Sequence, residues 1–296
     1  MHTRKLDSRL FVHLFFILFS LLFVLPFLLV IAISLSRESD VLEHGYKLIP
    51  REIDFTAYRI VFRNTSEMTR AYGVTAFQSV VTMVLSLTIM SMCAYSLARR
   101  SFALRKPITF FIFFTMLFGG GLIPSYILNT QYLHIGNTIW IYILPSLANA
   151  FYIIIFRTFF QGLPDGLIES AKIDGAGELR VYLQIVVPLS KPVFATFALF
   201  VLLERWNDWF QALIYIRDAK LYTLQFLLQK ILLEAEFIRN MARDMPANLQ
   251  NAGSTEIPSE TVRFAMAIVA AGPLLIVFPF FQKHFAKGLT VGSIKG

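Results

Sequence analysis

Long apolar runs separated by shorter polar segments dominate the chain. A helix needs about 20 apolar residues to cross the hydrocarbon core of a bilayer. The first run is too long for the apolar region of a signal peptide and has no clean cleavage site, so we predict that it is a retained span. We therefore predict an all-α polytopic membrane protein with six transmembrane helices, at Phe11–Leu35, Ala71–Ala98, Pro107–Leu128, Thr138–Phe160, Pro192–Ile216 and Phe264–Gln282.

Two segments depart from this simple pattern. Gly119–Gly121 interrupts the third run just before Pro124, which is typical of close helix packing or a kink rather than of a phosphate-binding loop. Between the fifth and sixth runs, Leu221–Met241 has its apolar residues at helical spacing. This spacing predicts an amphipathic surface helix that covers the membrane part from outside or contacts an extracytoplasmic partner.

Composition and charge fix the expected orientation. Hydrophobic residues make up 56% of the 296 residues, and the net charge is +8. The short segments before the first run, between the second and third, and after the sixth are rich in Lys and Arg, whereas the two longer loops carry as many acidic as basic residues. Because basic short loops stay in the cytoplasm, we predict a membrane protein with both termini cytoplasmic. The charge is then a topology signal, not a sign of nucleic-acid binding.

Glu169–Pro188 is a polar, glycine-containing segment between the fourth and fifth runs. A simple connection would be shorter. Its length suits a helix, a turn and a second short helix, and its charges are nearly balanced. The segment therefore predicts a docking element on the cytoplasmic side.

A second polar group lies inside the fifth run, where Glu204–Phe210 reads ERWNDWF. Glu204 and Asp208 share a helix face, and Arg205 is beside both, which is compatible with a buried ion pair that fixes helix contacts. Alternatively, the aromatic and polar residues line a substrate path, because aromatic faces stack on sugar rings and Asn and Asp bond hydroxyls. The candidates for that path are Trp206, Asn207, Asp208 and Trp209, with Asn149 and Tyr152 from the fourth run. Tyr126, Asn129 and Gln131 are weaker candidates.

Residues for catalysis are not evident. The five histidines are scattered without a zinc-binding spacing, and no P-loop, dinucleotide-binding fingerprint or nucleophile elbow occurs. The single cysteine, Cys93, cannot form an intramolecular disulfide and is interpreted as a packing residue. These observations argue against an enzyme and predict no metal site.

The polar segment resembles the coupling motif of ATP-binding-cassette (ABC) importer permeases. That motif consists of EAA, three variable residues, G, nine variable residues, I, one variable residue and LP. Here Glu169–Ala171 reads ESA, Gly175 is the glycine, and Ile185, Val187 and Pro188 close it. Further strings are similar to the second permease of maltose-type carbohydrate importers and to the branch for complex oligosaccharides and polysaccharides: WND at 206–208, GGLIPSY at 120–126, NTIW at 137–140, FPFFQKHFAKG at 278–288 and GLTVGSIKG at 288–296.

The resemblance implies a type I importer permease fold with a cytoplasmic coupling helix. It assigns ATPase coupling to Glu169, Ser170, Ala171, Asp174, Gly175, Gly177 and Pro188, and further contacts to Gly292, Ser293 and Lys295. The implied partners are a second homologous permease, two ATPase subunits and a solute-binding protein. No cofactor is expected in this chain, because ATP and Mg would bind to the ATPase subunits.

The implied organisation has three parts: an N-terminal span and outer loop at 1–70, a core at 71–290 with the coupling motif at 165–188, and a cytoplasmic tail at 291–296. The expected substrates are oligosaccharides or polysaccharide fragments, with uronate polymers such as alginate as one candidate. Two alternatives stay open: a secondary sugar transporter, which should have internal repeats and midplane carboxylates, and a structural subunit of a membrane complex.

Overall fold

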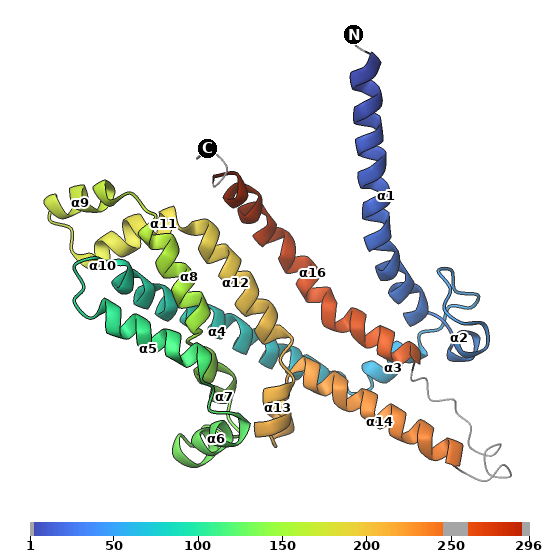
Figure 1. Ribbon diagram of the computed structural model, residues 1–296. Helices are drawn as coiled ribbons and strands as arrows, with labels where there is room; N and C mark the ends of the chain where they lie inside the picture. Colours follow the sequence, from blue (N-terminus) through green and yellow to red (C-terminus); the bar gives the residue numbers. More distant parts are fainter. Residues whose placement is uncertain (1–2, 245–259, 292–296) are drawn as a thin grey trace. The chain divides into compact units, whose positions relative to one another are not determined.

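The computed structural model describes residues 3–244 and 260–291 and is helical throughout that range apart from turns and one isolated bridge between Ser36 and Ile53 (Figure 1). The chain forms two compact units. Unit 1 contains residues 1–65 and 227–273, and unit 2 contains residues 66–226 and 274–296. The predicted C-terminal contacts at 292–296 lie outside the described residues. The all-α class is confirmed.

Unit 1 contains the first long helix and the loop segment that follows it. Its elements are α1 (Thr3–Ser34), α2 (Glu38–His44), α3 (Thr56–Val61), most of α14 (Leu224–Asp244) and the first part of α16 (Glu260–Val291). The buried Glu38 side chain accepts hydrogen bonds from the backbone N–H groups of Glu260 and Thr261, at 3.0 and 2.9 Å. These are two donors that α16 leaves free at its N-terminus, so α2 supplies the cap of the last long helix.

Unit 2 holds the remaining elements. They are α4 (Thr65–Ala98), α5 (Arg105–Leu117), α6 (Leu122–Ile127), η1 (Leu128–Tyr132), α7 (Trp140–Ile143), η2 (Leu144–Ser146), α8 (Ala150–Gln161), α9 (Asp165–Ile173), α10 (Glu178–Val181), η3 (Tyr182–Val186), α11 (Val187–Leu189), α12 (Lys191–Trp206), α13 (Phe210–Tyr215) and η4 (Ala219–Leu221). In Figure 1 the short helices α9 and α10 lie at the same end of this unit as the link from α4 to α5.

Three described helices are long and apolar enough to cross a membrane unaided: Leu10–Ser34 within α1, the whole of α4, and Glu260–Phe281 within α16. Three bent helix pairs raise the number to six if each pair is one span. The predicted count of six is reached only in this way. Bending is tolerated in membrane proteins where neighbouring helices satisfy the exposed backbone groups.

The bends fall at identifiable residues. The third predicted span breaks after α5 and turns by 114° into α6–η1. The break contains Gly121 at φ +84°, a conformation that favours glycine, so the kink predicted at Gly119–Gly121 is confirmed. In the fourth span, α7–η2 and α8 meet at 47°.

The fifth predicted span, Pro192–Ile216, was wrong as a single helix. Helix α12 ends at Trp206 and α13 begins only at Phe210. The pair that could form one bent span is Glu178–Leu189 with α12, at 81°. Asn207 and Asp208 lie in the gap between α12 and α13. Hydropathy could not find this break, because apolar residues continue on both sides of it.

The largest apolar core of unit 2 joins α4, α8, α9, η3 and α12. It includes Phe156, which is fully buried and packs against Phe194 and Phe197 with tilted rings whose centroids are 4.9 and 4.8 Å away. Tyr182 enters the same core and shares a hydrogen bond of 2.6 Å with the Ser91 hydroxyl on α4. This core holds the segment that contains the coupling motif against the long helices.

The amphipathic helix expected at Leu221–Met241 is confirmed as α14. Leu224, Leu227 and Leu228 are buried, whereas Leu233 and Phe237 further along the helix are exposed. Its predicted role as an outer cover or a partner contact stays a prediction.

Candidate functional site

Helix α9 carries the first half of the coupling motif and is bound to the rest of unit 2 by few side chains. Ile168 is its only buried residue, and Ala171 is half-buried against the same core. Glu169 and Ser170 are exposed, and Ile173 is 86% exposed. The sequence thus places one anchoring residue inward and leaves a face of polar and apolar side chains available for contact.

The C-terminus of α9 explains why a glycine is needed at position 175. The N–H of Gly175 donates to the Lys172 carbonyl at 3.0 Å, and the N–H of Ala176 donates to the Ala171 carbonyl at 2.9 Å. This pair of bonds defines a Schellman motif, whose left-handed residue is Gly175 at φ +79°. Gly177 has φ −70° and needs no such freedom. The turn predicted for both glycines therefore depends on Gly175 alone.

The turn is also closed by side chains. Glu178, the first residue of α10, forms a salt bridge with Lys172 of α9. Its other carboxylate oxygen accepts a hydrogen bond of 2.6 Å from the Tyr95 hydroxyl on α4. The Arg99 guanidinium lies over the Tyr95 ring, 5.3 Å from its centroid. Helices α9 and α10 are therefore tied to each other and to the end of α4.

The second half of the motif segment contributes buried residues to the core, although the motif residues Ile185 and Val187 are themselves only half-buried. Val181, Tyr182 and Val186 are buried and join the core of unit 2, whereas Pro188 is exposed at the start of α11. The motif segment thus has an exposed first half on α9 and a second half on α10 and η3 that is anchored in the core. The anchored half gives the exposed half a rigid attachment to the long helices.

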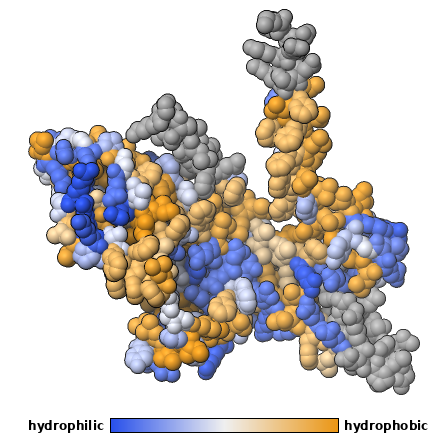
Figure 2. All heavy atoms as spheres, viewed as in Figure 1, coloured by the Kyte–Doolittle hydropathy of each residue, from blue (hydrophilic) through white to orange (hydrophobic). Residues whose placement is uncertain are grey.

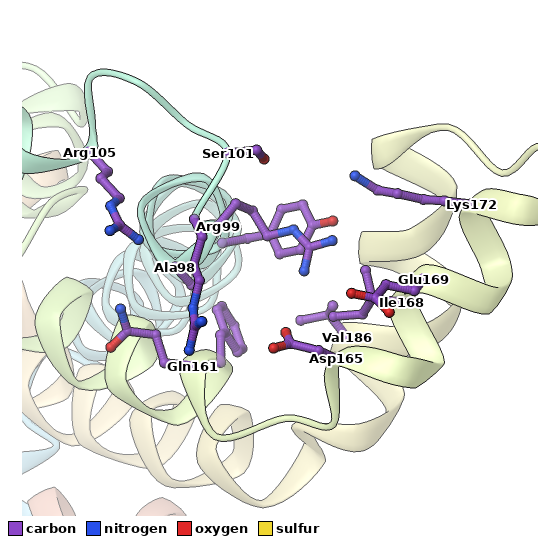
Figure 3. A pocket seen from close by; sticks show the side chains of 13 residues that line it. Ala98, Arg99, Ser101, Arg105, Gln161, Asp165, Ile168, Glu169, Lys172 and Val186 are labelled. Atoms are coloured by element: carbon purple, nitrogen blue, oxygen red, sulfur yellow. The ribbon is translucent and has the colours of Figure 1, made fainter.

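A cleft of about 500 Å³ lies between α9, the end of α4 and the start of α5. Figure 3 shows Arg99 and Arg105 on one side of it and Asp165 and Glu169 on the other. Its polar lining is completed by Tyr95, Arg100, Ser101, Gln161 and Lys172. The cleft presents both signs of charge, so it can receive a segment that also carries both.

The second candidate group has Arg205 at its centre. One guanidinium nitrogen of Arg205 donates to Asp208 at 3.0 Å and to the Ser146 hydroxyl at 2.8 Å. The other nitrogen donates to Glu204 at 2.8 Å. The side chains of Arg205 and Asp208 are 9% and 8% exposed, and that of Glu204 is 53% exposed. The pair Arg205–Asp208 is therefore internal, and Glu204 reaches the surface.

Backbone contacts complete this network. The Arg205 carbonyl accepts a bond of 2.7 Å from Gln78 on α4. Asp208 accepts a bond from the N–H of Gln211 at 3.1 Å, and its carbonyl accepts one from the Thr223 hydroxyl at 2.9 Å. Asp208 therefore holds the break between α12 and α13 together. This arrangement matches the ion-pair interpretation of these residues.

The other predicted path residues divide by exposure. Trp206 is buried and packs against Tyr72, with ring centroids 6.5 Å apart. Asn207 is exposed and accepts a hydrogen bond of 3.2 Å from Gln225, and Trp209 is 41% exposed. Asn207 and Trp209 can therefore meet a ligand, whereas Trp206 contacts its own chain.

Asn149 and Tyr152 come together with Glu204 and Arg205 around a small pocket of about 130 Å³. Asn149 is also the N-cap of α8, because its side-chain oxygen accepts the N–H groups of Phe151 and Tyr152 at 3.0 and 3.3 Å. Sequence analysis grouped these residues only because polar and aromatic side chains suit sugar binding. The fold brings α8 and α12 close enough for them to share one pocket.

Three residues in these sites were missed by sequence reasoning: Gln78, Tyr95 and Ser146. Each lies in an apolar helix run and is far in sequence from the residue it bonds, which is Arg205 for Gln78 and Ser146 and Glu178 for Tyr95. No local motif therefore identifies them. A polar side chain inside a membrane-length run is the one signal that could have drawn attention to Gln78.

Residues 91–291 match the family of binding-protein-dependent transport system inner membrane components. The chain belongs to this family. It is 38% identical over 268 residues to the polygalacturonan/rhamnogalacturonan transport system permease protein YtcP of Bacillus subtilis (strain 168), covering 90% of this chain and 91% of that one. It is also 40% identical over 267 residues to Protein LplC of the same organism, covering 90% and 88%.

A crystal structure of a bacterial ABC transporter involved in the import of the acidic polysaccharide alginate contains a similar chain. The two agree with a TM-score of 0.76 at 29% identity, over 96% of this chain and 98% of that one. The chain is therefore a permease component of a binding-protein-dependent importer, with the type I permease fold that its motif predicted.

Proposed function

We propose that this permease imports oligosaccharides or polysaccharide fragments and that α9 is its docking helix for an ATPase subunit. Helix α9 carries this proposal because it is exposed, has a single buried anchor at Ile168 and ends in a turn that requires Gly175. The second half of the motif segment would pass movement of α9 to α12. Rigid-body rocking of the spans would then alternate access between the two sides.

The proposed assembly contains a second permease, two ATPase subunits and a solute-binding protein in the inner membrane. ATP and Mg would be bound by the ATPase subunits, and this chain would perform no chemistry of its own. Glu169 would meet a basic group of the ATPase, and the neighbouring cleft would receive a further segment of it.

The proposed substrate class follows from the named relatives, whose cargoes include polygalacturonan, rhamnogalacturonan and the acidic polysaccharide alginate. Asn149, Tyr152, Glu204, Asn207 and Trp209 are the accessible residues we propose for the path. Asp208 is less suited to binding sugar, because Arg205 and the backbone N–H of Gln211 occupy its carboxylate. The same occupancy makes it a poor coupling-ion site for a secondary transporter.

The test is uptake of labelled oligogalacturonides and neutral oligosaccharides into vesicles that contain the complete importer. We expect uptake that requires ATP, and Glu169→Lys should abolish it together with co-purification of the ATPase. Gln184→Lys is the matched control, because it places a positive charge at an exposed position of η3 that has no assigned coupling role, and it should have a weaker effect. Uptake that continues without ATP would overturn the proposal that import is driven by ATP. A Glu169→Lys permease that still binds its ATPase would overturn the assignment of α9 as the docking helix.

A further inference from the structure

A groove of about 400 Å³ lies between α5 and α8, apart from both candidate sites. Its apolar lining comes from Phe110 and Phe113 on α5 and Ile154 on α8, and its charged lining from Lys106 and Arg157. Phe110 is 69% exposed and Phe113 is 48% exposed. The groove is thus an apolar channel on the surface of unit 2 that contains two cations.

The two cations lie at one end of the groove. Lys106 is in the first turn of α5, and Arg157 is near the C-terminus of α8. Arg105 and Gln161 both line the cleft of about 500 Å³ beside α9, so the start of α5 and the end of α8 lie at the same end of this helix pair. Phe113 is further along α5, away from that end. From the start of α5 onward, the groove is therefore lined first by the two cations and then by apolar side chains.

Within the described residues, neither cation of the groove has a carboxylate partner. No carboxylate in the described part of the chain lies within ion-pair distance of Lys106 or Arg157, although Arg157 donates one hydrogen bond of 3.3 Å to the Leu97 carbonyl. The only hydroxyl of the groove, on Thr109, already donates to the Arg105 carbonyl at 2.6 Å. The lining offers positive charge and apolar surface but few hydrogen-bonding groups.

We propose that this groove is a binding site for an anionic membrane phospholipid. Lys106 and Arg157 bind the headgroup phosphate, and an acyl chain lies against Phe110, Phe113 and Ile154. Basic pockets between membrane helices bind such headgroups on the cytoplasmic side, where anionic lipids attract Lys and Arg. The predicted orientation puts the basic end of α5 on that side.

The same lining argues against other ligands. A saccharide needs many hydrogen-bonding partners, and this groove offers only its two cations and the Thr109 hydroxyl. Helix α5 has no fully buried residue along its thirteen positions: Ile108 and Ile112 pack against the core of unit 2, whereas Phe110 and Phe113 stay exposed. Figure 2 shows hydrophilic residues gathered near the start of α5 and hydrophobic ones along the rest of it. A phospholipid, with a charged headgroup followed by acyl chains, matches this change from polar to apolar surface along α5.

The test uses the purified full-length chain in detergent, titrated with phosphatidylglycerol or phosphatidylcholine and followed by native mass spectrometry. We expect phosphatidylglycerol to bind roughly tenfold more tightly, since each cation near an anionic headgroup contributes several-fold. The double variant Lys106→Gln/Arg157→Gln should remove that preference. The matched control Arg180→Gln/Lys191→Gln removes two exposed charges outside the groove and should keep it.

Two further variants protect the result from a folding artefact. Arg157→Lys keeps the charge and should retain most of the preference, and Lys106→Gln alone should lose part of it. Equal losses in the groove and control variants would overturn the proposal, because the preference would then reflect total charge. In the assembled importer, a photoreactive residue at Phe113 should yield lipid adducts. An adduct with another subunit instead would show that a protein covers the groove.

Discussion

The two polar groups of this permease look alike in sequence, but they are built in opposite ways. Helix α9 has one buried residue and presents Glu169, Ser170 and Ile173 to the outside. The group around Arg205 is closed on itself, because Asp208, Ser146 and Glu204 occupy its guanidinium. A polar segment in a membrane protein can therefore serve to bind a partner or to hold helices together, and the number of internal bonds tells the two apart.

The largest effect should come from breaking the closed group. Arg205→Ala leaves the buried Asp208 carboxylate without its cation, and we expect a loss of about 3–5 kcal/mol in the free energy of unfolding. Thermal unfolding of the purified chain measures it. Glu204→Gln, at an exposed partner of the same guanidinium, should cost under about 1 kcal/mol. Equal losses would mean that Asp208 does not depend on Arg205.

Removing the anchor of α9 should have the next largest effect, but a local one. Ile168→Ala creates a cavity at its only buried residue, at a cost of about 2–4 kcal/mol. Hydrogen exchange should rise in residues 165–177 and stay unchanged in α4 and α12. Leu167→Ala, at a neighbour that is 46% exposed, should leave exchange unaltered. A global loss of protection in Ile168→Ala would show that α9 is part of the folding core.

The turn after α9 provides a smaller and sharper test. Gly175→Ala places a Cβ at φ +79° in open space, so only backbone strain opposes it, at about 1–2 kcal/mol. We expect weaker ATPase co-purification with little change in global unfolding temperature. Gly177→Ala, at φ −70° and also in open space, should behave as wild type. If both variants lose binding, flexibility rather than the left-handed turn is what docking requires.

The smallest effect is expected at Gln78, which joins α4 to the closed group. Its amide donates to the Arg205 carbonyl at 2.7 Å, yet its own side-chain oxygen has no hydrogen-bond partner in the described part of the chain. Gln78→Leu removes the bond to Arg205, a second bond of 3.1 Å to the Ser79 hydroxyl and one unsatisfied acceptor, so we expect a change of about 1 kcal/mol. A loss near that of Arg205→Ala would assign Gln78 a central place in the network.

Much of the fold follows from local pattern. Hydropathy located α1, α4 and α16, because length and apolar composition alone are enough to predict a membrane-spanning helix. Helical spacing located α14, and the glycines before Pro124 located the sharp bend after α5. The motif in 165–188 was recognisable because its residues are close in sequence, and so was its division into helix, turn and helix.

Tertiary structure alone decided the rest, since it depends on residues that are distant in sequence. Only the fold could end α12 at Trp206, where Asp208 and Thr223 fix a break that hydropathy does not register. It also placed Tyr95 on Glu178 and gathered Asn149, Tyr152 and Glu204 around one pocket. The sequence by itself determined which segments are apolar and long enough to cross a membrane and which segment carries the family motif, because both are patterns of residues close together in the chain. Which polar side chains are satisfied internally, and which stay available, was set by packing between helices.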